Sequence, residues 1–129
     1  MQIAVLQMTS GIDPAANAAT IVGAVERAGA GGARVLFTPE MSGLVDRDRE
    51  RATRHVVPAQ DNPVLAAVRT AAARAGISVA LGSLAVLRED GRWANRSFVI
   101  GPNGDILATY DKIHMFDVAL ANGESWRES

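Results

Sequence analysis

The sequence predicts an α/β protein that has one mixed β-sheet with helices on one of its faces. Up to Leu87, short apolar runs alternate with longer stretches whose apolar residues recur at helical spacing. After Leu87, the apolar runs are separated only by short turn sequences. Strands joined through helices are parallel, whereas strands joined by tight turns are antiparallel. The order strand-helix-strand-helix-strand-strand-strand therefore predicts a sheet with a parallel first part and an antiparallel second part.

A first strand is predicted at residues 2–8, an apolar run that is long enough for a buried strand and short for a helix. Asp13-Pro14 then indicates a helix start, because aspartate caps helices and proline fits their first position. Apolar residues recur at helical spacing up to Ala28, and the helix is expected to end near Gly29. The glycine cluster that begins there could suggest a phosphate cradle. A dinucleotide-binding loop follows a strand and opens a helix, however, so a connecting loop is favoured.

A second strand and a second helix follow. Residues 34–37 form an apolar run that ends at Thr-Pro (38–39), because the residue before proline avoids the α region. The highly charged segment 46–54 predicts a short solvated helix or a loop. Its charges of opposite sign stand at helical spacing in the pairs Asp46/Arg49, Asp48/Arg51 and Glu50/Arg54. Asn-Pro at 62–63 repeats the helix-start signal, and that helix is expected to end at Gly76.

The second half of the sheet is predicted as three antiparallel strands. The runs that form them are residues 77–87, 93–100 and 105–111. Glu-Asp-Gly at 89–91 and Pro-Asn-Gly at 102–104 separate these runs, and such tripeptides are typical of turns. No internal repeat or domain boundary is visible, so residues 1–129 are expected to belong to one domain.

The composition excludes several classes of function. The formal net charge is −1, which provides no basic field for binding nucleic acid or an anionic membrane. No run reaches the roughly 20 apolar residues of a membrane span, and no basic residues precede the first apolar run as they would in a signal peptide. The absence of cysteine excludes thiolate metal sites, and His55 and His114 stand far apart in the sequence. We therefore expect a cytoplasmic protein without a metal or organic cofactor.

Two charged side chains follow the ends of predicted strands. Glu40 comes just after the second strand, at the edge of the sheet where ligands of α/β proteins gather. Lys112 comes directly after the last strand. Each also has an ordinary interpretation, as a surface glutamate and as a solvated lysine at a sheet edge. His114 is more often structural or exposed than catalytic in such a position. The glycosylation-type sequence at residues 95–97 is interpreted as coincidental, because no signal peptide is expected.

In this order and setting, several segments resemble the nitrilase superfamily of carbon–nitrogen hydrolases. The resemblance covers the whole chain. The matching segments are IAVLQM, RVLFTPEM, GSLAV, WANRSFVIGPNGDILATYDKIHMFD and GESWRES. The run YDKIHMFD, after a PNGD turn, is the most specific of them. It looks closest to the branch that contains omega-amidase and deaminated-glutathione amidase.

The resemblance implies half of an αββα sandwich and the chemistry of amide hydrolysis. It implies that Glu40 is the general base and that Lys112 is the second catalytic residue, which holds positive charge beside the oxyanion. Glu128 resembles the additional active-site glutamate of that branch. The implied substrate is a small linear amide, such as an omega-amide of a 2-oxo acid or a deaminated glutathione-like molecule. The implied assembly of the full-length protein is a homodimer or a higher homo-oligomer.

The departure from the family concerns the nucleophile, which in the family is a cysteine that follows a further strand. This chain contains no cysteine, and Ser125 and Ser129 lie outside any strand-turn-helix signal. We therefore expect residues 1–129 to be the N-terminal part of a carbon–nitrogen hydrolase domain, truncated before the nucleophile strand, and to be inactive alone. The alternative, from another class, is a non-catalytic remnant that acts only by binding or assembly.

Two geometric expectations follow. Glu40 and Lys112 should lie close together at one end of the sheet, although they are far apart in the sequence. The crossover rule places both helices on the same face of the sheet. The other face should then be uncovered, so that the chain alone associates through it. The exposed apolar side chains on that face should be those of Val5, Leu36, Val79 and Val99, or of their alternating neighbours.

Overall fold

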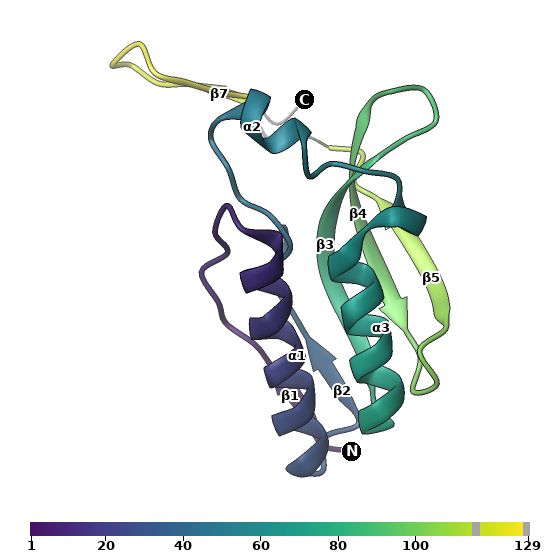
Figure 1. The fold of residues 1–129 in the computed structure, drawn as a ribbon. Helices are drawn as coiled ribbons and strands as arrows, with labels where there is room; N and C mark the ends of the chain where they lie inside the picture. Colours follow the sequence, from purple (N-terminus) through teal and green to yellow (C-terminus); the bar gives the residue numbers. More distant parts are fainter. Residues whose placement is uncertain (115–116, 128–129) are drawn as a thin grey trace.

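The computed structural model describes residues 1–114 and 117–127, and it shows a mixed five-stranded sheet with two helices packed on one face (Figure 1). The strand order is β1-β2-β3-β4-β5. The strands are β1 (Ile3–Val5), β2 (Val35–Phe37), β3 (Ser78–Leu87), β4 (Trp93–Ile100) and β5 (Ile106–Asp111). The first three are parallel, and β4 and β5 are antiparallel to their neighbours. The predicted fold class is confirmed.

The two long helices begin and end at the predicted signals. In α1 (Pro14–Ala30), the Asp13 side chain accepts a hydrogen bond from the backbone N–H of Ala15. In α3 (Pro63–Ala75), the Asn62 side chain accepts from two backbone N–H groups of the first turn. Helix α3 ends at Gly76, whose φ of 68° is a left-handed conformation that glycine adopts without steric cost. Within the described ranges, no helix is long and apolar enough to cross a membrane.

The core lies between these helices and the sheet face that they cover. Helices α1 and α3 lie side by side on that face (Figure 1). The largest fully buried apolar side chains are those of Ile21, Val25, Leu36, Val68, Val79, Leu81, Leu84, Val86, Phe98 and Ile100. Burying one such side chain contributes about 1.5–3 kcal/mol. The core therefore holds the sheet and the two helices together as one body.

The opposite face of the sheet carries exposed apolar side chains. Val5 is 75% exposed and Val99 is 41% exposed, as predicted. The prediction was wrong for Leu36 and Val79, which are buried because their side chains point toward the helices. Their alternating neighbours face the other way, and Phe37 next to Leu36 is exposed. Association of the chain through this face stays a prediction.

The charged segment 46–54, for which a short solvated helix or a loop was predicted, contains the helix α2 (Arg49–Thr53). Three short elements were not predicted from the sequence: the 3₁₀ turn η1 (Ala59–Asp61), β6 (Asp117–Ala119) and β7 (Ser125–Arg127). Strands β6 and β7 form a separate antiparallel hairpin, which projects from the end of the sheet near α2 (Figure 1). Its turn contains Asn122-Gly123, a dipeptide common in hairpin turns. The first strand is also shorter than the predicted run 2–8, because only three of its residues pair with β2.

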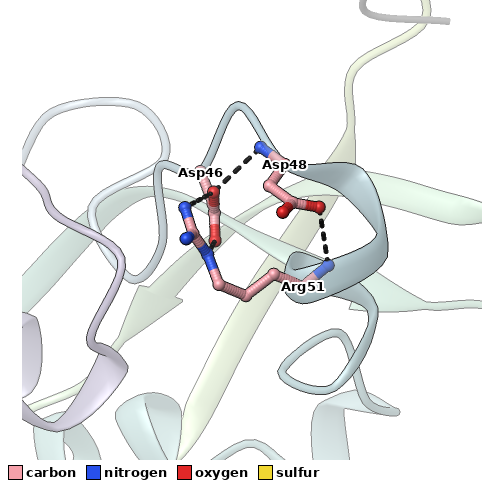
Figure 2. A network of polar contacts seen from close by, with 3 residues as sticks. All are labelled: Asp46, Asp48 and Arg51. Atoms are coloured by element: carbon pink, nitrogen blue, oxygen red, sulfur yellow. Dashed lines mark hydrogen bonds and ion pairs between the residues drawn. The ribbon is translucent and has the colours of Figure 1, made fainter.

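The charged segment that leads into α2 is ordered by one aspartate. The Asp46 carboxylate accepts two hydrogen bonds from the Arg51 guanidinium, at 2.7 Å from Nε and 2.6 Å from Nη2 (Figure 2). It also accepts from the backbone N–H of Asp48, whose own side chain caps α2. The hydrogen bonds from Arg51 lower the pKa of Asp46 to about 2. The predicted pair Asp46/Arg49 was wrong, because the Arg49 guanidinium lies instead 4.3 Å from the ring centroid of Trp93.

A bulge in β3 brings the end of β2 close to the sheet. The pairing of β3 with β4 shifts register between Leu81 and Leu84, which places Gly82 and Ser83 in the irregular step. A Cβ atom built on Gly82 would lie 2.3 Å from the carbonyl oxygen of Pro39. The backbone after β2 therefore passes over position 82 at a distance that only glycine permits.

We predict that Gly82→Ala destabilises the protein by about 2–3 kcal/mol, because the added methyl group meets backbone atoms that cannot move aside cheaply. Urea denaturation followed by circular dichroism at a fixed protein concentration measures this change. Gly11→Ala is the matched control, since a Cβ there meets nothing within 4 Å. Equal urea midpoints for the two variants would show that the crossing over Gly82 is not tight.

We predict that α2 loses its order as the pH falls from about 4 to about 2. The pKa of Asp46 is lowered on folding, so its contribution is present above the unfolded-state value of about 3.9 and is lost as pH falls through the folded-state value. Backbone chemical shifts of Arg49 to Thr53, followed with pH, measure the transition. Asp46→Asn should abolish it. Asp90→Asn removes the surface pair with Arg88 and should leave it unchanged. Shifts in the parent chain that do not change over this range would contradict the prediction.

Candidate active site

Glu40 stands in a strained turn immediately after β2. The next residue, Met41, has a φ of 52°, which costs a non-glycine residue on the order of 1 kcal/mol. The turn is held by Ser83 of the β3 bulge. Its hydroxyl accepts a hydrogen bond from the Met41 N–H at 2.8 Å, and its carbonyl accepts from the Ser42 N–H at 3.1 Å. The bulge thus fixes the direction in which the Glu40 side chain leaves the backbone.

Lys112 follows β5 and meets Glu40 at the same end of the sheet. The distance between Lys112 Nζ and Glu40 Oε1 is 3.1 Å, although the two residues are 72 positions apart. The predicted proximity is confirmed. The Glu40 side chain is 55% exposed and that of Lys112 is 33% exposed. Water therefore reaches both groups and screens their attraction.

Asn95 is a third member of this cluster, and the sequence reasoning missed it. Its Nδ2 donates a hydrogen bond of 2.6 Å to Glu40 Oε1. Its backbone carbonyl accepts from the Lys112 N–H at 2.9 Å. In the sequence it stands in the glycosylation-type run at residues 95–97, which is interpreted as coincidental. A usable signal was nevertheless present, because asparagine is depleted in strands and here stands inside one.

Strands β4 and β5 also carry an ion pair, on the side of the sheet away from Asn95 and Lys112. Arg96 pairs with Asp111 in the strand register, and its guanidinium donates two hydrogen bonds to the Asp111 carboxylate, at 2.6 and 3.1 Å. The Arg96 guanidinium lowers the pKa of Asp111. Side chains alternate along a strand, so this pair points away from Asn95 and Lys112. The ion pair holds β4 and β5 together at the positions next to Asn95 and Lys112 in the sequence.

A hollow of about 430 Å³ lies between α2 and β7. Its lining includes Asp46, Arg47, Arg49, Trp93, Glu124, Ser125 and Arg127. Trp93 precedes Asn95 by two positions in β4, so both side chains lie on the same side of that strand. Arginine side chains are suited to binding carboxylates. The hollow is therefore rich in groups that could hold an anionic part of a small molecule.

The remaining predicted site residues are placed as follows. Glu128 lies outside the described residues. His114 follows Lys112 closely and is exposed. Within residues 1–114 and 117–127, no group of three or more His, Asp or Glu side chains lies close enough to hold a metal ion. The described site thus consists of a carboxylate, an ammonium group and a carboxamide.

This arrangement can move a proton and stabilise a negative charge. A carboxylate with an open side can act as a general base, and an ammonium group beside it can stabilise an oxyanion. A covalent mechanism additionally needs a nucleophile. The sequence contains no cysteine to fill that role.

The comparisons with known proteins agree on one family. A model of the carbon–nitrogen hydrolase family matches residues 2–129. The nitrilase and fragile histidine triad fusion protein NitFhit of Drosophila melanogaster is 34% identical over 116 residues, which cover 90% of this chain and 25% of that protein. Deaminated glutathione amidase of Yersinia enterocolitica is 30% identical over 120 residues, which cover 92% of this chain and 41% of that protein.

Solved structures give the same result. The C. elegans NitFhit protein superposes with a TM-score of 0.84 at 27% identity, covering 98% of this chain and 31% of that one. An amidase from Nesterenkonia sp. superposes with a TM-score of 0.76 at 27% identity, covering 90% of this chain and 44% of that one. Variants of that amidase carry acrylamide or acetamide groups added to an active-site cysteine.

The chain spans less than half the length of these relatives. Its mixed sheet with helices on one face corresponds to part of the α/β fold of nitrilase-superfamily amidases. The match of the family model nevertheless covers nearly every residue. This chain therefore belongs to the carbon–nitrogen hydrolase family.

Proposed function

We propose that this chain supplies the general base and the lysine of an amidase that hydrolyses the carbon–nitrogen bond of small linear amides. The observation that carries the proposal is the contact between Glu40 and Lys112 at the end of the sheet. The nucleophile would be a cysteine that lies outside these 129 residues. The active-site cysteine of the Nesterenkonia amidase, which has the same fold over 90% of this chain, supports that assignment.

The first half of the reaction forms a thioester and releases ammonia. Glu40 takes the proton of the cysteine thiol, and the thiolate sulfur forms a bond to the amide carbon. The carbonyl oxygen becomes an oxyanion, which the Lys112 ammonium group stabilises. The carbon–nitrogen bond then breaks, and Glu40 returns its proton to the leaving nitrogen.

The second half of the reaction hydrolyses the thioester. Glu40 takes a proton from a water molecule, whose oxygen attacks the thioester carbon. Lys112 again stabilises the oxyanion. The carbon–sulfur bond breaks, the thiolate regains its proton from Glu40, and the carboxylic acid leaves. Glu128 would orient the lysine or the water.

The surroundings of the cluster favour a substrate that carries a carboxylate as well as the amide. Arg47, Arg49 and Arg127 line the hollow between α2 and β7, together with the carboxylates of Asp46 and Glu124. Asp46 is already paired with Arg51 and so opposes an incoming anion less than a free carboxylate would. An omega-amide of a 2-oxo acid or a deaminated glutathione-like molecule fits this description. The name of the Yersinia relative points the same way.

A second candidate is that the chain is a non-catalytic remnant that acts only by binding or assembly. The absence of cysteine favours it for the 129 residues as given. The exposed apolar face provides a surface through which such a remnant would associate. In both readings the 129 residues alone hydrolyse no amide. The readings differ in whether the chain supports hydrolysis once a cysteine-bearing half is present.

We predict that a hybrid of residues 1–129 and the C-terminal part of the Yersinia amidase hydrolyses amides, and that Glu40→Gln abolishes the activity. The amide keeps the shape of glutamate but cannot accept the proton, so kcat should fall by about 10²–10⁴. Lys112→Met should have a comparable effect, because the oxyanion loses its stabilising charge. Release of ammonia from small omega-amides measures the rate.

Glu89→Gln, in the turn between β3 and β4, is the matched control and should keep the parent rate. Circular dichroism checks that each variant is folded. A folded hybrid without activity would favour the non-catalytic reading. Near-parent rates for Glu40→Gln or Lys112→Met would show that the role given to that residue is wrong.

A further inference from the structure

The two oxygens of the Glu40 carboxylate have different surroundings. Oε1 accepts a hydrogen bond of 2.6 Å from Asn95 Nδ2 and one of 3.1 Å from Lys112 Nζ. Within residues 1–114 and 117–127, both hydrogen bonds to this carboxylate are accepted by Oε1. A carboxylate has about four lone-pair sites on its two oxygens, so two donors fill Oε1 and leave Oε2 open.

We propose that Asn95 is a positioning residue that holds Oε1 of Glu40 and thereby assigns proton transfer to Oε2. This inference rests on the proposed function, because it concerns the same general base. In the first step the proton of the thiol would pass to Oε2, and from Oε2 it would pass to the leaving nitrogen. Oε1 would keep its two donors throughout.

Lys112 alone would not hold the Glu40 carboxylate with Oε1 engaged and Oε2 open. Its ammonium group is a compact charge on a flexible stem, and it can contact either carboxylate oxygen. The terminal torsion of a glutamate side chain is broad, so the carboxylate would otherwise rotate. Asn95 has a short side chain on β4, and its amide donates to Oε1 of the Glu40 carboxylate.

The strands around Asn95 keep the two donors in a fixed relation. The Lys112 N–H donates to the Asn95 carbonyl at 2.9 Å, so the backbones of the two donor residues are joined directly. The bidentate pair of Arg96 and Asp111 holds the same two strands from the other side. Asn95 is therefore attached to a rigid part of the sheet, as a residue that orients a base must be.

A measurement on the 129-residue chain tests the contact without any catalysis. At pH 7 we expect the side-chain amide resonances of Asn95 to move in Glu40→Gln, because the acceptor loses its charge. Glu89→Gln, in the turn between β3 and β4, should leave these resonances in place. Amide resonances of Asn95 that are the same in the parent chain and in Glu40→Gln would overturn the proposal.

Kinetics of the hybrid test the consequence for the reaction. Asn95→Leu keeps the volume and removes the donor, so kcat should fall about tenfold to a hundredfold, which is less than the roughly 10²–10⁴ that the general base itself contributes. KM should change little, because Asn95 acts through Glu40 and the expected effect is on the proton-transfer step. A merely structural role would instead lower the folded fraction of the enzyme, which circular dichroism detects, and would not lower kcat at an unchanged KM in the folded variant.

Asn103→Leu is the matched control, because Asn103 also donates to a carboxylate, that of Asp105, in a turn outside the cluster. It should leave kcat and KM unchanged. If Asn95→Leu does not fold, Asn95→Ala takes its place, with the same expected results. A folded Asn95 variant with the parent kcat would overturn the proposal while leaving the proposed function intact. An inactive parent hybrid, by contrast, would count against the proposed function, and the amide resonances would still decide the role of Asn95.

Discussion

The structure depends on the close passage of the chain over Gly82. The end of β2 crosses the β3 bulge so closely that no side chain fits at position 82. The bulge also supplies polar partners. The Gly82 N–H donates to the Thr38 hydroxyl at 3.0 Å, and the two polar groups of Ser83 accept from the backbone beyond Glu40. These bonds hold Met41 in its strained conformation and direct Glu40 toward the open face of the sheet.

The antiparallel strands bring the partners of Glu40 to the same place. Strand β4 begins at this end of the sheet and β5 finishes there, so Asn95 and Lys112 become neighbours through the strand register. Lys112 is the only lysine in a chain whose other basic side chains are arginines, apart from the two histidines. A single lysine at this position, among many arginines elsewhere, fits a role that a guanidinium does not fill equally well.

Much of this could be predicted from the sequence, because local signals and strand order agree. Asp13-Pro14 and Asn62-Pro63 mark helix starts through capping, which acts over a few residues. The proximity of Glu40 and Lys112 was expected because each follows the end of a predicted strand and because both match catalytic residues of the family that the sequence resembles. An asparagine inside a strand marked position 95 in the sequence, but its contact with Glu40 could not be predicted, because that contact depends on the register of β4 and on the bulge at Gly82. The pairing of Asp46 with Arg51 was missed for a similar reason, since the segment before α2 is not helical and helical spacing does not apply there.

The central claim is that the fold places Glu40 against Lys112, and the single lysine makes a direct measurement possible. A water-soluble carbodiimide joins a carboxylate to an amine only where the two are in contact, and peptide mass spectrometry identifies the pair. The account predicts that Lys112 is joined chiefly to Glu40 and that Gly82→Ala reduces this product. Coupling of Lys112 to other carboxylates in preference to Glu40, in the folded chain, would contradict it.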